Sequence, residues 1–194
     1  MMIVTPGPGV LTTAGIGSGF GWRAGLRFLI GLNLGTNLTM LMVATGLTAA
    51  VFSIPGLRTA LLIASVAYFI YLATKIAFAG AKIGFIAAQR APTIRDGILL
   101  QMINPKAYAV GSLLITGFAF YPDSFVIEVA WKFVLMNLVW IPVHILWLGA
   151  GVTVRRMELP TGTQRFINYV MAASLIVVVV VAAITASDAS LPAG

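Results

Sequence analysis

Long apolar runs separated by short polar connections dominate the chain, and this pattern predicts an all-α integral membrane protein. A helix needs roughly 20 mostly apolar residues to cross a bilayer, and charged residues stand mostly between the runs. With the opening segment, the runs predict six transmembrane helices in one polytopic domain over residues 1–194. The expected spans are residues 1–18, shortened, then 28–52, 59–79, 97–120, 126–152 and 166–187.

Composition strengthens the membrane assignment and narrows the partners. The chain is 60% hydrophobic and only 9% charged, whereas a soluble domain carries roughly 25% charged residues. Its net charge of +7 could indicate nucleic acid, but the basic residues stand between apolar runs and form no continuous face. We therefore expect the lipid bilayer and a small-molecule substrate as partners, and no nucleic acid.

The inventory of reactive side chains argues against enzymatic chemistry. The sequence has no cysteine, which excludes disulfides and thiol catalysis. One histidine and five scattered acidic residues leave too few groups for a metal site or for an acid–base pair. From these counts we expect neither an enzyme nor a metal-binding protein.

Basic residues also orient the predicted spans. They are concentrated in the connections after spans one, three and five, whereas the connections after spans two and four carry few of them. The positive-inside rule makes the basic connections cytoplasmic. This predicts a multi-pass protein of the bacterial plasma (inner) membrane with both termini in the periplasm. The basic residues are Arg23, Arg27, Lys82, Arg90, Arg95, Arg155, Arg156 and Arg165.

Proline and glycine interrupt two of the predicted spans. "TPGPG" (Thr5 to Gly9) lies in span one and "NPK" (Asn104 to Lys106) lies in span four. Irregular backbone at membrane depth survives only where it is buried or lines a cavity, and secondary transporters use such broken helices at their substrate sites. The two breaks are three spans apart, so their helices run in opposite directions. This predicts two inverted three-helix repeats with helices 1 and 4 broken by proline.

These interrupted segments also carry a family resemblance. The chain resembles the LysE/RhtB family of amino-acid exporters, which has a "PGP" signature, a "RAGL…G…LG" stretch and a later "G…NPK(A)" motif. The corresponding residues are Pro6-Gly7-Pro8, "WRAGLRFLIGLNLG" (Trp22 to Gly35) and "RDGILLQMINPKAYAV" (Arg95 to Val110). The resemblance implies export of amino acids or close derivatives, driven by the proton-motive force and without a cofactor.

The chain departs from that family pattern in two places. Gly9 stands where many members have asparagine, which removes a side-chain contact. The first span is also short, because its breaks lie only a few residues after Met1. We expect a start codon further upstream, with about 10–15 residues before Met1.

The breaks supply the first candidate site residues. Two prolines flank Gly7, so we expect Pro6, Gly7 and Pro8 to form an unwound segment that lines the substrate path, rather than a packing kink. Pro105 is expected to free the carbonyl of a residue near Gln101, one turn back.

Lys106 stands next to this second break. It lies several residues inside its span, where a cation is costly and usually functional. It is expected to hold a substrate carboxylate or to titrate, with Asn104 as its neutral hydrogen-bonding partner; the alternative is a helix start at the interface, with Lys106 extending to water.

Other polar residues within the spans have two readings. Asn33 and Asn37 lie on one face of span two, either as a close helix contact joined by hydrogen bonds or as a polar stripe along the substrate path. His144 is either bonded to a neighbouring carbonyl or a proton carrier, and it shares the proton-relay candidacy with Lys106. Lys132 is expected to extend to the outer interface.

The function predicted from these residues is export of amino acids by proton antiport with alternating access. The alternatives from the sequence are an uncoupled small-solute channel and a structural membrane subunit. Small-residue patterns such as "GLNLG" pack helices within one chain or between two, so a homodimer is among the expected partners.

Overall fold

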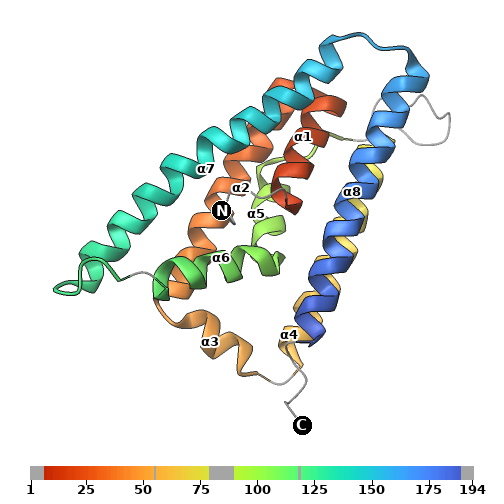
Figure 1. The fold of residues 1–194 in the computed structure, drawn as a ribbon. Helices are drawn as coiled ribbons and strands as arrows, with labels where there is room; N and C mark the ends of the chain where they lie inside the picture. The colour runs from red at the N-terminus through yellow and green to blue at the C-terminus, as the bar shows by residue number, and fades with distance from the viewer. Residues whose placement is uncertain (1–6, 55, 79–89, 118, 189–194) are drawn as a thin grey trace.

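Every regular element of the structure is an α-helix. The structure is a computed structural model, and it describes residues 7–54, 56–78, 90–117 and 119–188. The all-α fold predicted from the sequence is confirmed for these residues. The helices are α1 Pro8–Phe20, α2 Trp22–Ala44, α3 Leu47–Phe52, α4 Leu57–Ala77, α5 Ile94–Ile103, α6 Pro105–Thr116, α7 Phe125–Arg156 and α8 Thr161–Asp188 (Figure 1).

Several helices have the length and composition of membrane spans. Among the described residues, Trp22–Ala44, Thr59–Ala77 and Phe125–Arg156 are long and apolar enough to cross a bilayer. Helices α5 and α6 meet the same test as a pair, bent by 68° at their junction. By this measure the described helices give three or four spans, where the sequence pattern predicts six.

Two of the predicted spans differ from the helices that form. The interval 28–52 contains α2 and the separate short helix α3, because Gly46 takes a φ of 73° that an α-helix does not accommodate. The interval 97–120 contains α5 and α6, which join at the predicted break before Pro105. Helices α2 and α7 also extend past the expected ends, and each includes basic residues that the hydropathy pattern places in connections.

Glycines allow two pairs of helices to pack backbone against backbone. A Cβ atom at Gly31 of α2 would overlap the carbonyl oxygen of Ile94 of α5, and one at Gly97 of α5 would overlap that of Phe28. On the other side of the molecule, a Cβ atom at Gly151 of α7 would overlap the carbonyl oxygen of Ala14 of α1. Helix α2 is therefore tightly paired with α5, and α1 with α7.

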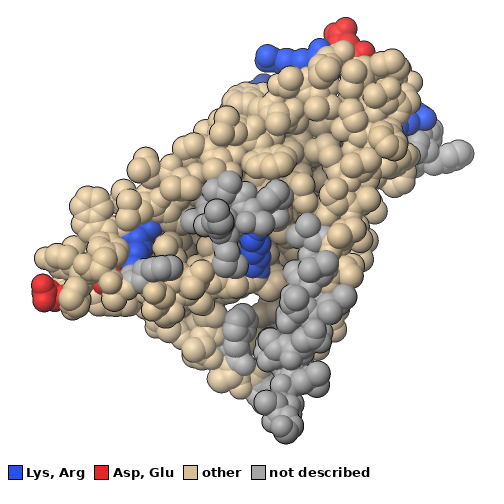
Figure 2. All heavy atoms as spheres, in the orientation of Figure 1, with Lys and Arg blue, Asp and Glu red and all other residues tan. Residues whose placement is uncertain are grey.

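The exterior carries the apolar surface that a bilayer requires. Leu138 and Leu146 of α7 are 68% and 72% exposed, and a surface of this kind is stable only against lipid or another apolar partner. Figure 2 shows a mostly uncharged surface, with charged side chains gathered where α7 and α8 connect and toward the opposite tip of the molecule, and with a basic group near the centre of this face. Buried side chains that join the helices include Phe28, Leu32, Phe69, Leu72, Ile76, Leu100, Leu148 and Leu175.

Candidate functional site

A cavity lies where two helices begin at a proline. Helix α1 starts at Pro8 with Gly7 as its N-cap, and α6 starts at Pro105 with Asn104 as its N-cap. Proline suits the first position of a helix, because the N–H that it lacks would have no helical partner there. The cavity volume is about 60 Å³, enough for a few water molecules. Its lining residues are Gly7, Pro8, Gly9, Val10, Thr36, Met40, Gln101, Asn104, Lys106, Ala107, Val110, Gly111, Met136, Trp140 and His144.

A chain of hydrogen bonds fixes the second break against α2. Gln101 Nε2 donates to Thr36 Oγ1 (2.5 Å), and Asn104 Nδ2 donates to Gln101 Oε1 (2.8 Å). Asn104 Oδ1 in turn accepts the backbone N–H of Lys106 (3.1 Å) and so caps α6. The carbonyl of Gln101 accepts the N–H of Asn104 at 3.2 Å, so the expectation of a free carbonyl at this residue is wrong. This bond joins residues three apart, so a tighter turn before Pro105 takes the place of the α-helical bond that the proline cannot form.

Lys106 reaches from the second break to the first. A Cβ atom at Gly7 would lie 2.7 Å from Lys106 Nζ, so the ammonium group rests against the backbone just before α1. The Lys106 side chain is neither fully exposed nor fully buried, and it lines the cavity. The structure thus brings together Gly7, Pro8, Asn104 and Lys106 of the predicted site residues, with Pro105 starting α6 directly beside them. Pro6 lies outside the described residues.

His144 closes the cavity from α7. Its side chain is 4% exposed, and its ring stacks on Trp140 with 3.6 Å between ring centroids. Nδ1 lies 2.9 Å from the carbonyl oxygen of Trp140, and since a carbonyl only accepts, Nδ1 carries the proton. Nε2 is then the acceptor nitrogen of the neutral ring. It faces the start of α1, 3.6 Å from where a Cβ atom of Gly9 would lie.

Asn33 and Asn37 lie away from the cavity, at the contact between α2 and α7. Asn33 Nδ2 donates to Asn137 Oδ1 (2.7 Å), and Asn137 Nδ2 donates to Asn37 Oδ1 (2.7 Å). Neither Asn33 nor Asn37 is among the lining residues. This geometry fits the interhelical alternative, in which amide side chains join two helices.

Replacing Asn137 by alanine tests that alternative. Without the Asn137 amide we expect unfolding free energy to fall by about 0.6–2 kcal/mol, with substrate affinity unchanged. Thermal unfolding in detergent and equilibrium binding measure the two quantities. Thr153→Ala is the matched control, because its hydroxyl bonds only the Gly149 carbonyl of its own helix (2.9 Å). Unchanged stability together with weakened binding would instead place these asparagines on the substrate path.

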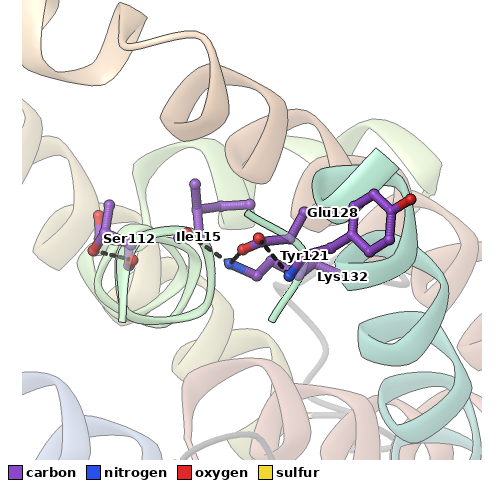
Figure 3. Close-up of polar contacts among 6 residues, drawn as sticks. Ser112, Ile115, Tyr121, Glu128 and Lys132 are labelled. Carbon is purple, nitrogen blue, oxygen red and sulfur yellow. Dashed lines mark hydrogen bonds and ion pairs between the residues drawn. The ribbon is translucent and has the colours of Figure 1, made fainter. Parts of the chain in front are cut away.

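Sequence reasoning missed an ion pair at the start of α7. Lys132 Nζ lies 2.6 Å from Glu128 Oε1, and the lysine side chain is 2% exposed (Figure 3). The expectation that Lys132 extends to the interface is wrong, because a carboxylate one helical turn away holds it inside. The Glu-x-x-x-Lys spacing could have indicated this pair. Sequence reasoning also missed the cavity residues Thr36 and Gln101. Both are polar side chains within an apolar span, and this feature could have identified them.

The amino-acid sequence matches a known protein family over most of its length. The model of the LysE type translocator family matches residues 1–186. The chain belongs to this family. Membership confirms the resemblance seen in the sequence and makes this LysE type translocator a membrane transporter, in a family of transporters rather than enzymes. No curated protein and no solved structure matches the chain.

Proposed function

We propose that this LysE type translocator is a secondary transporter of the bacterial inner membrane that exports amino acids or close derivatives by proton antiport. The observation that carries the proposal is the cavity between the starts of α1 and α6, with Lys106 bridging the two breaks. Broken helices whose N-terminal ends meet at one cavity are the usual way for a transporter to bind the charged groups of a substrate.

The cavity offers complementary partners for a zwitterion. A carboxylate would be bound by the Lys106 ammonium group and by the positive ends of α1 and α6. An ammonium group would donate to Nε2 of His144 on the opposite wall. The described lining residues include no aspartate or glutamate and are otherwise largely apolar. We therefore propose a substrate with a neutral side chain, since a cationic side chain would lack a counter-ion there.

The contacts between helices support the inverted-repeat architecture. We assign α1, α2 and α4 to the first repeat, and α5 with α6, α7 and α8 to the second. The broken span of each repeat then packs on the second span of the other, because α1 packs on α7 while α5 and α6 pack on α2. The third spans, α4 and α8, pack on each other. A twofold relation between the repeats would produce this exchange, and alternating access would be its motion.

Proton coupling and orientation complete the proposal. Lys106 and His144 both line the cavity, so a proton carried by either would meet the substrate there. Proton-motive force would supply the energy, with no bound cofactor. The basic residues at the end of α7, Arg155 and Arg156, would lie in the cytoplasm and the chain termini in the periplasm. A homodimer stays a prediction.

Transport by purified protein in proteoliposomes tests the function. The vesicles are loaded with a mixture of amino acids and assayed with and without an imposed pH gradient. We expect gradient-dependent loss of amino acids with neutral side chains, while lysine and arginine are retained. Flux that ignores the pH gradient would indicate an uncoupled channel. Absence of flux from folded protein would contradict the amino-acid assignment.

A further inference from the structure

The end of α6 that points away from the cavity is held by a buried cation. Lys132 Nζ of α7 donates to the carbonyl oxygen of Ile115 (2.8 Å), in the last turn of α6 (Figure 3). The last carbonyls of a helix lack helical partners and form its negative end. Lys132 therefore caps α6 across an interhelical gap, and Glu128 balances its charge.

Glu128 extends the same cluster to the connection between α6 and α7. Its Oε2 accepts the backbone N–H of Tyr121 (3.0 Å), while its Oε1 contacts Lys132 (Figure 3). One carboxylate thus links the connecting segment to the cation that caps α6. We call this cluster the α6 latch; it consists of Ile115, Tyr121, Glu128 and Lys132.

The α6 latch matters because α6 has little other contact with α7. Helix α6 packs mainly on α2, whereas α1 packs along much of α7. At the opposite end of α7, Arg155 Nη1 donates to the carbonyl oxygen of Gly19 in the last turn of α1 (2.9 Å). Both helices that start at the cavity therefore end on a cation of α7. Of these two contacts, the one between Lys132 and Ile115 is buried and the one between Arg155 and Gly19 is exposed. Helix α6 also has few other contacts with α7, whereas α1 has many.

Helix α7 is long enough to connect the latch to the cavity. His144 lies about 18 Å along the helix axis from Lys132 and about 17 Å from Arg155, at about 1.5 Å per residue. The cavity is thus near the midpoint between the two capping cations. A change of the α6 latch would move the wall of the cavity formed by α6 without touching the residues that face substrate.

We propose that the α6 latch is the gate contact on the face of the membrane where α6 ends, and that Lys132 and Glu128 are positioning residues for transport. While Lys132 holds Ile115, α6 stays against α7 and the cavity is closed toward that face. When the contact opens, α6 moves with α2 and the cavity opens there. The inference rests on the proposed transport function, but its test needs no transported substrate.

A single reporter cysteine makes the gate measurable. The chain has no cysteine, so Val110→Cys places one thiol on the cavity wall formed by α6. Its reaction rate with a membrane-impermeant maleimide is measured from each face, in right-side-out and inside-out vesicles that contain the full chain. With Lys132→Met or Glu128→Gln, we expect labelling from the α6 face to rise about tenfold, within the usual range for a coupled conformational equilibrium. Labelling from the other face should not rise.

Two variants separate a latch from a merely structural role. Lys132→Arg keeps a cation for the Ile115 carbonyl and should label as slowly as the parent. The double variant Glu128→Lys with Lys132→Glu keeps an ion pair but presents a carboxylate to that carbonyl, so it should label fast. Arg155→Met is the matched control on the same helix and should leave labelling from the α6 face unchanged.

The outcomes decide the inference independently of transport. Unchanged labelling in folded Lys132→Met and Glu128→Gln would overturn it, as would slow labelling of the charge-swapped variant. Equal increases from both faces would indicate general loosening and would overturn it as well. Fast labelling from the α6 face alone supports the gate even if no amino acid is transported, in which case only the proposed substrate fails.

Discussion

Replacing Lys106 by alanine is expected to reduce gradient-driven transport by about 10- to 150-fold, the equivalent of the 1.5–3 kcal/mol that a hydrogen bond to a charged group contributes. The Lys106 ammonium group lies where the two breaks meet, beside Gly7 and at the start of α6. Without it, a substrate carboxylate would keep only the helix ends as partners. Initial rates of amino-acid loss from proteoliposomes under a pH gradient measure the effect.

Two variants control the Lys106 experiment. Lys106→Arg retains a cation and should keep part of the activity. Gly7→Ala retains the lysine but places a methyl group 2.7 Å from the present position of Nζ, so the ammonium group must move and transport should fall. Normal transport by Lys106→Ala, in protein that elutes as a single folded species, would remove Lys106 from the substrate path.

Replacing Gly151 by alanine is expected to lower unfolding free energy by about 1–3 kcal/mol, the usual effect of overpacking a tight contact. A Cβ atom there overlaps the carbonyl oxygen of Ala14, so α1 and α7 must separate. Loss of glycine from a helix would by itself add up to about 1 kcal/mol of stability. A net loss therefore identifies the backbone contact as its cause. Thermal unfolding in detergent, followed by tryptophan fluorescence, measures the change.

Gly149 provides a matched control two residues away. A Cβ atom at Gly149 would meet Trp22 at 3.9 Å, which is an ordinary van der Waals distance. Gly149→Ala should therefore leave stability unchanged or raise it by up to about 1 kcal/mol. If both variants behave alike, the close approach of α1 and α7 does not contribute to stability.

Much of the fold can be read from the sequence because lipid simplifies the pattern. The apolar runs predict helices at α4, α7 and α8 to within a few residues, since no charge interrupts their centres. The pattern fails at α2 and α3, where the run carries no charge and α2 ends at Ala44, two residues before Gly46, whose φ is positive. Hydropathy depends on the side chains alone, so a backbone turn inside an uncharged run does not change the hydropathy pattern.

From the sequence, the candidate site could be predicted only at residues whose type is unusual within an apolar run. Pro8, Asn104 and Lys106 are conspicuous because prolines and a cation are unusual within apolar runs. Sequence reasoning also singled out His144, but it missed the side chains of Thr36 and Gln101. All three come from other helices, and only the packing of those helices brings them to one cavity. The asparagines of α2 show the reverse case, since their spacing predicts a shared face but cannot tell whether that face meets a cavity or α7.

The contacts of α1 have a consequence for biogenesis. Helix α1 is the first helix of the described chain to leave the ribosome, but it is held by side chains made much later. Gly19 is capped by Arg155, and Ser18 bonds to Gln164 (2.9 Å) and to Asn168 (3.3 Å). None of these contacts can form until more than half of the protein has been synthesised. Helix α1 therefore reaches its final packing only after α7 and the start of α8 have been made, and a nascent chain arrested before α7 lacks the cavity wall that Trp140 and His144 form.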